Sequence, residues 1–314
     1  MIKIASTVKH EIIRTVNLSK HYGNVKAVDK ISLNVKKGEI YGFLGLNGAG
    51  KTTTIRMLLG MIRPTNGKSY LKEERVDAGS SQLWNSVGYL VEIPYSYPEL
   101  TVNENLEITR RLRFLPDSSS VDSIIRKLKL EPYQNIKAKN LSLGNAQRLG
   151  LAKALIHNPD ILILDEPSNG LDPAGIVEIR ELLHDFAFNE GVTVFISSHI
   201  LSEISKIATR IGIIHEGKLI QEMNAKELHR YRNRRLLIDL KDKKSAHALL
   251  KKQGFDSTLT KDGLIEITSA KALVHPEDVN SHLVKAGFPP SMLKIEEEEL
   301  ESYFLRIIGK KGVI

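Results

Sequence analysis

The sequence contains no cysteine, which excludes disulfide bonds and zinc sites built on thiolates. It also lacks any apolar stretch that approaches the roughly 20 residues of a membrane-spanning helix. The first 14 residues have no unbroken apolar core of the kind that signal peptides carry. We therefore expect that another chain spans the membrane if this protein works at one.

Basic residues outnumber acidic ones, 45 to 37, which gives a formal net charge of +8. Such an excess can attract nucleic acid or an anionic lipid surface. Here, however, the basic residues are scattered, and no stretch interleaves aromatic residues with arginines as a base-stacking groove would. We interpret the charge as a solvated, lysine-rich exterior and expect no nucleic-acid partner.

Short apolar runs organise the first two thirds of the chain. Residues 11–45 alternate apolar and polar side chains in short runs that are broken by Gly23 and Gly38, which predicts strands and turns. The runs "ILILD" at 161–165 and "TVFISS" at 193–198 are almost wholly apolar, as is typical of buried parallel strands. Because predicted helices separate these strands, we expect an α/β fold with a largely parallel sheet.

The chain is long enough for one large and one small domain. We expect an N-terminal tail at 1–10, a main domain at 11–228 with a helical subdomain at about 93–155, and a C-terminal α/β accessory domain at 229–314. A hairpin turning at Glu216–Gly217 precedes the boundary. Within the accessory domain the pattern predicts strands at 235–240, 263–268 and 292–295, helices at 245–253 and 276–286, and a final helix.

The segment "GLNGAGKTT" fits the P-loop pattern, in which Gly45 and four further residues precede Gly50-Lys51-Thr52. It follows the apolar run "IYGFL" and opens a predicted helix, which is the context that the motif requires. Backbone N–H groups and the helix N-terminus would hold phosphates, Lys51 would neutralise them, and Thr52 would bind magnesium. We assign to this cradle Gly45, Asn47, Gly48, Ala49, Gly50, Lys51, Thr52 and Thr53.

Two acids follow the strand-like run at 161–165. Asp165 ends the run, where it can hold Mg2+ directly or through water. Glu166 comes next and can polarise the water that attacks the terminal phosphate. We therefore predict that Glu166 is the catalytic base.

Further motifs resemble those of ATP-binding-cassette (ABC) proteins and occur in the order of that family. "LSLGNAQR" at 141–148 resembles the signature sequence, "SNGLD" the D-loop and "SSH" the switch-histidine loop, and the resemblance covers about residues 11–225. It implies a P-loop ABC nucleotide-binding domain with a mixed sheet and a helical subdomain, which binds ATP and Mg2+.

The resemblance also implies roles for individual residues. Tyr22 would stack on adenine, with Val28 in the same ATP site, and His199 would contact the γ-phosphate and the attacking water. Asp172 of the D-loop would couple two sites across a head-to-tail homodimer. The signature residues that would meet the ATP of the second copy are Ser142, Leu143, Gly144 and Asn145.

Three positions depart from the usual ABC pattern. Leu143 replaces a glycine and Asn145 a glutamine in the signature, and we expect activity to survive both. Glu92 stands where the family places a glutamine, at the start of a loop that contacts the membrane partner. Since a carboxylate can still offer oxygen to magnesium, the predicted metal set is Thr52, Asp165 and Glu92. The stretch from Pro94 to Pro98 would line a groove for a permease helix.

The combination of these motifs is similar to ATPase subunits of lantibiotic-immunity and bacitracin-resistance transporters. That resemblance implies an ATPase that powers export or membrane extraction of an antimicrobial peptide, at the cytoplasmic face of the bacterial membrane. Integral-membrane permease subunits would contact the peptide. The alternatives are an exporter of another substrate, a ribosome-acting or DNA-repair ABC ATPase, or a nucleotide-gated binding module that does not hydrolyse ATP.

Overall fold

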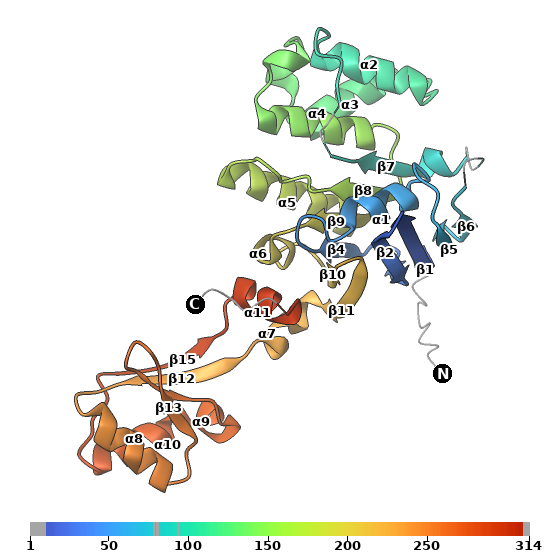
Figure 1. Cartoon of the computed structure of the whole chain (residues 1–314). Coiled ribbons are helices and arrows are strands. Elements are labelled where there is room, and N and C mark those ends of the chain that lie inside the picture. Colours follow the sequence, from blue (N-terminus) through green and yellow to red (C-terminus); the bar gives the residue numbers. More distant parts are fainter. Residues whose placement is uncertain (1–10, 78, 80–81, 93–94, 310–314) are drawn as a thin grey trace, which may run out of the picture. The chain divides into compact units, whose positions relative to one another are not determined.

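The computed structural model describes residues 11–77, 79, 82–92 and 95–309. The expected tail at 1–10, and residues 93–94 of the loop after Glu92, lie outside these ranges. The chain divides into two compact units between Lys226 and Glu227 (Figure 1). Among the described residues, no helix has the length and apolar character to cross a membrane.

A six-stranded sheet forms the centre of the first unit. Side by side, its strands are β11 (Lys218–Asn224), β10 (Arg210–His215), β4 (Ile40–Leu44), β9 (Thr193–Ser198), β8 (Ile161–Asp165) and β7 (Val87–Leu90). All neighbours run parallel except β11 and β10, which form the hairpin predicted at Glu216–Gly217. The expectation of a largely parallel sheet is confirmed.

The central strands β4, β8 and β9 are buried on both faces of the sheet, since alternate side chains point to opposite sides and all of them are buried. On one face, Phe195 of β9 stacks on Tyr41 of β4 with ring centroids 5.5 Å apart. On the other face, Ile196 lines a cavity together with Leu183 and Ile204 from helices α5 (Pro173–Phe188) and α6 (Leu201–Ile204). Burial on both faces explains why these strands are almost continuous apolar runs.

An antiparallel sheet covers the Tyr41 face. Its strands are β2 (Val25–Ile31), β1 (Glu11–Tyr22), β5 (Asn66–Leu71) and β6 (Glu74–Arg75), and β3 (Asn34–Lys36) also pairs with β1. Helix α1 (Lys51–Leu58) shares the same core, in which its Ile55 and Leu58 are buried with Ile13 of β1. The P-loop helix is therefore held by both sheets.

The helical subdomain consists of α2 (Val102–Leu112), α3 (Ser119–Lys127) and α4 (Leu143–Leu155). Thr101 and Glu104 form a reciprocal capping box that starts α2. Two side chains connect this subdomain to the start of β7: Arg113 donates to the Val87 carbonyl at 3.4 Å, and His157 lies 3.0 Å from the same oxygen.

The second unit holds an antiparallel sheet in the order β13 (Ser257–Leu259), β14 (Ile265–Ile267), β12 (Arg234–Asp239) and β15 (Met292–Glu297). Its helices are α7 (Leu228–Tyr231), α8 (Lys243–Lys252), α9 (Ala270–Val274), α10 (Pro276–Lys285) and α11 (Leu300–Ile307). Strands and main helices alternate as in a ferredoxin-like split βαβ arrangement. β13 and α9 were not predicted from the sequence, because neither short segment shows a clear apolar period.

Opposite charge runs meet in this second sheet. The register of β12 and β15 places Arg234 opposite Glu297 and Arg235 opposite Glu296. Arg235 donates to Glu296 at 2.7 Å, which lowers the pKa of that carboxyl from its ordinary value. The acidic run "EEEE" at 296–299 is thus paired largely within its own unit, so it does not form a free acidic surface.

We predict that His157 makes the folding of the first unit pH-dependent. Burial, with a smaller effect of Arg113, lowers the pKa of His157 to about 4. Its Nδ1 is buried without a hydrogen-bond partner among the described residues, so the protonated ring is disfavoured in the folded state. Because the unfolded chain takes up this proton near pH 6.5, stability should fall as the pH drops from about 6.5 to about 4.

The test is the free energy of unfolding of the first unit between pH 7 and pH 4. His157→Gln should flatten the pH dependence by about 1–2 kcal/mol, less than the full linkage value because the ring is partly exposed. His184→Gln, at an exposed position of α5, should leave the dependence unchanged. An identical slope in the native chain and in His157→Gln would contradict the assignment.

Candidate active site

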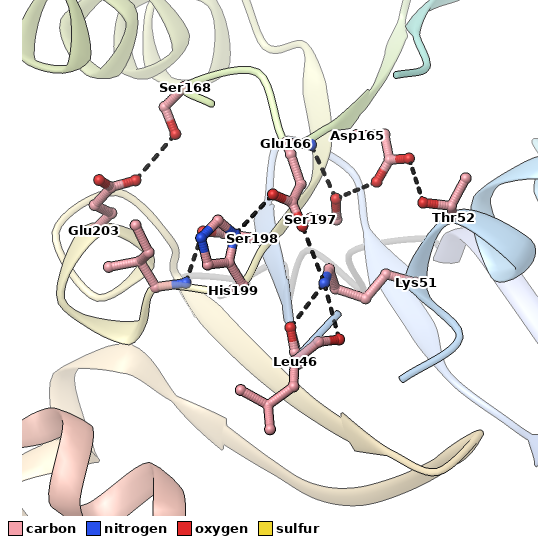
Figure 2. A network of polar contacts seen from close by, with 12 residues as sticks. Leu46, Lys51, Thr52, Asp165, Glu166, Ser168, Ser197, Ser198, His199 and Glu203 are labelled. Atoms are coloured by element: carbon pink, nitrogen blue, oxygen red, sulfur yellow. Dashed lines mark hydrogen bonds and ion pairs between the residues drawn. The ribbon is translucent and has the colours of Figure 1, made fainter. Parts of the chain in front are cut away.

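The P-loop connects β4 to α1 and places Lys51 at the first position of the helix. Lys51 is only 5% exposed. Its Nζ donates to the carbonyl oxygens of Gly45 at 2.7 Å and Leu46 at 3.2 Å, so the loop wraps around its own lysine (Figure 2). The same ammonium group lies 3.0 Å from Oε1 of Glu166.

Gly50, the residue before the helix, shows why the motif needs glycine. Its φ of +106° belongs to a region that residues with a side chain rarely adopt. A Cβ at this position would also lie 2.4 Å from the carbonyl oxygen of Ala27. The turn therefore directs the first N–H groups of α1 outward only because Gly50 has no side chain, which fits the anion cradle expected from the sequence.

Asp165 joins the P-loop helix to the central sheet. One carboxylate oxygen accepts a hydrogen bond from Thr52 Oγ1 at 2.7 Å, and the other accepts from Ser197 Oγ at 2.5 Å. Asp165 is 3% exposed; its bond to Ser197 is buried, and its bond to Thr52 is partly buried. Thr52 and Asp165 together present two hard oxygen donors, the kind of ligand that Mg2+ prefers.

Glu166 lies at the centre of the polar network (Figure 2). Its Oε1 faces Lys51, and its Oε2 accepts from Nδ1 of His199 at 2.7 Å. Its backbone N–H donates to Ser197 Oγ at 3.0 Å, and its φ of +49° is unusual for a residue with a side chain. The structure thus brings Lys51, Glu166 and His199 together.

The residues expected around adenine lie on the antiparallel sheet. Tyr22, at the end of β1, is 52% exposed, and the Lys20 ammonium lies 5.1 Å from the centroid of its ring. Such a ring is available for stacking. Val28 is fully buried, in the same core cluster as Ile55 of the P-loop helix.

The signature residues open helix α4. Ser142 caps it, with its Oγ accepting from the N–H of Asn145 at 3.3 Å. Asp172 caps α5 in the same manner, accepting from the N–H of Gly175 at 3.0 Å. Leu143 is 50% exposed and points at the D-loop residue Gly170.

Glu92 does not stand free. Its Oε1 forms an ion pair of 2.5 Å with Arg56 of α1, and its φ is +59°. The pair is exposed, 57% for Glu92 and 40% for Arg56, so it stabilises the fold only modestly. Glu92 therefore contacts an exposed side chain of the P-loop helix, Arg56. This partner was not predicted from the sequence.

Sequence analysis also missed Ser197, which contacts both acids of the site. The parallel register of β8 and β9 sets Asp165 opposite Ser197, and their side chains meet at the carboxyl ends of the two strands. The signal was present in the motif "SSH", whose first serine lies two residues before His199. Only strand pairing reveals which of its two hydroxyls reaches Asp165.

Comparisons with known proteins agree with this geometry. Residues 28–169 match the family described as ABC transporter. A bacitracin transport ATP-binding protein, BcrA of Bacillus licheniformis, is 42% identical over 301 residues, which cover 95% of this chain and 97% of that protein. The lantibiotic transport ATP-binding protein SrtF of Streptococcus pyogenes is 39% identical over 67% of this chain and 90% of its own length.

Among solved structures, the dimeric structure of a bacterial ABC transporter cassette matches with a TM-score of 0.63. That match has 26% sequence identity and covers 68% of this chain and 99% of the cassette. Fold and site together define a P-loop ATPase cassette. The chain belongs to the family of ABC transporter ATP-binding subunits, whose cassettes form dimers and work with membrane permease subunits.

We predict that Ser197 aligns both acids for hydrolysis. Ser197→Ala removes one hydrogen bond to buried Asp165 and one to the Glu166 backbone, each deletion costing about 1–3 kcal/mol when a buried partner is left unpaired. Steady-state ATP hydrolysis should therefore show kcat lowered at least ~10-fold, while Ser197→Thr, which keeps the hydroxyl, should retain most activity. Native kcat in Ser197→Ala would refute the role.

Proposed function

We propose that this chain powers the removal of an antimicrobial peptide from the membrane. The observation that carries the proposal is the 42% identity to a bacitracin transport ATP-binding protein over 301 residues. The first unit ends at Lys226, so a match of that length must include most of the second unit as well. The likeness therefore extends beyond the part of the chain that ATP-binding cassettes share.

We propose that magnesium binds at Thr52 and Asp165. Their side-chain oxygens lie 2.7 Å apart beside the phosphate cradle, and both are hard donors. The ion would offset the charge of the β- and γ-phosphates there. Glu92 is the proposed third ligand, and to reach the metal its carboxylate must leave Arg56.

In this proposal ATP rearranges the ion pairs around Lys51. The triphosphate would compete for an ammonium group that now pairs with Glu166 and two loop carbonyls. When Lys51 turns to the phosphates, Glu166 loses its cationic partner and can accept the proton of the attacking water. His199 keeps the carboxylate oriented through its bond to Oε2.

Two copies of the chain would sandwich two ATP molecules, with Ser142, Gly144 and Asn145 of one copy facing the γ-phosphate of the other. The capped N-terminus of α4 supports this role, because its free N–H groups favour an anion. We place the complex at the cytoplasmic face of the membrane, where a permease contacts the peptide. The described part of the proposed permease groove is residues 95–98, in which Tyr95 and Tyr97 are 72% and 41% exposed.

We predict that Glu166→Gln uncouples ATP binding from hydrolysis. The amide keeps the size of the side chain but cannot accept a proton, so hydrolysis should fall at least ~100-fold. ATP with Mg2+ should then hold the variant as a dimer, measurable by light scattering after size-exclusion chromatography. Lys51→Ala is the control for binding and should form no such dimer. Turnover close to native in Glu166→Gln would remove the residue from this role.

Peptide resistance tests the transport proposal itself. Cells that carry the chain with its permease should resist a bacitracin- or lantibiotic-type peptide, and the Glu166→Gln chain should abolish that resistance while remaining bound to membranes. The chain should co-purify with a protein of several membrane spans. Co-purification with ribosomes or DNA instead, without any effect on peptide sensitivity, would favour the alternatives.

A further inference from the structure

Leu143, the first residue of α4, contacts the D-loop of its own chain. A Cβ placed on Gly170 would lie 2.6 Å from Leu143 Cδ2, so a side chain at position 170 would displace the end of Leu143. Gly170 also has φ +75°, which favours glycine. Leu143 can therefore rest on the loop only because Gly170 offers bare backbone.

The next residue, Gly144, also lies near the D-loop. A Cβ added to Gly144 would come within 3.7 Å of Cδ2 of Leu171, so the loop passes close to the first turn of α4. The existing side-chain contact of this turn with the loop is the one that Leu143 makes. Farther along α4, Arg148 pairs with Glu178 of α5, but Glu178 is 47% exposed and the pair is screened by solvent.

The D-loop carries this contact directly to Glu166. The N–H of Asn169 donates to the Glu166 carbonyl at 3.0 Å, and the N–H of Leu171 donates to Ser168 at 3.2 Å. Gly170 is thus linked to Glu166 by a segment with two successive backbone turns. The carboxylate of Glu166 is the group that Lys51 and His199 contact.

We propose that Leu143 is a positioning residue that links the two ATP sites of the dimer. The inference rests on the paired arrangement proposed above. In that arrangement α4 meets the ATP bound by the partner, whereas Glu166 acts on the ATP bound by its own chain. Through the contact of Leu143 with Gly170, ATP bound at one site therefore affects the position of Glu166 in the other site.

This role accounts for a leucine where ABC signatures usually have glycine. The anion-binding groups of α4 are backbone N–H groups, which a leucine does not remove. Its side chain adds an apolar contact to the loop, and such a contact can couple two sites when it favours one loop position. Leu143 would thus contact the partner's ATP through its backbone and the D-loop of its own chain through its side chain.

The experiment is steady-state hydrolysis and ATP binding by the full chain carrying Leu143→Ala. The backbone of α4 is kept, so ATP affinity and ATP-driven pairing in the Glu166→Gln background should stay within about twofold of the parent. The kcat should fall at least fivefold, because the base is no longer aligned by α4. Leu143→Met, which keeps the apolar reach, should restore it, and Leu259→Ala, at a half-exposed leucine of the second unit, should change nothing.

A double-mutant cycle with Gly170→Ala tests the contact itself. The added methyl group collides with Leu143 in the single variant, but Leu143→Ala makes room for it. The two effects on kcat should therefore differ from additivity by at least about threefold. Additive effects, or native kcat in Leu143→Ala, would overturn the inference. Failure of the Glu166→Gln parent to pair with ATP would instead contradict the proposed dimer.

Discussion

The buried carboxylate of Asp165 is the interaction on which the site depends. A charge removed from water is tolerated only when hydrogen-bond donors surround it, and Thr52 and Ser197 supply one to each oxygen. Those two donors come from the P-loop helix and from β9, so the same bonds fix the helix against the sheet. The P-loop helix and Glu166, the proposed catalytic base, are therefore both connected to Asp165, the first through Thr52 and the second through Ser197.

The parallel sheet brings the residues of the site together. Because β4, β8 and β9 run in the same direction, their carboxyl ends meet at one edge, as in other α/β folds that bind ligands there. Glu166 and His199 come directly after β8 and β9, and Lys51 follows β4 at the end of the P-loop. Burial on both faces of the sheet holds the strand ends in place, and the short loops after them carry the chemistry.

Two of the three departures from the usual ABC motifs have partners in the structure. Glu92 pairs with Arg56, which balances the charge of its carboxylate. Leu143 faces Gly170, whose missing side chain makes room for it. In each case an unusual residue is matched by a contact from a distant part of the chain. Such pairing indicates that the substitutions belong to a working arrangement rather than to a decayed one.

The sequence by itself determined the P-loop, the parallel strands and the order of the motifs, because glycine spacing and apolar runs act over a few neighbouring residues. It also placed Asp165, Glu166 and His199 at strand ends. Only the tertiary structure decided that Ser197 bonds Asp165, that Arg56 pairs with Glu92 and that the acidic run at 296–299 meets arginines. These contacts depend on strand register and helix packing across long sequence separations, which no local pattern records.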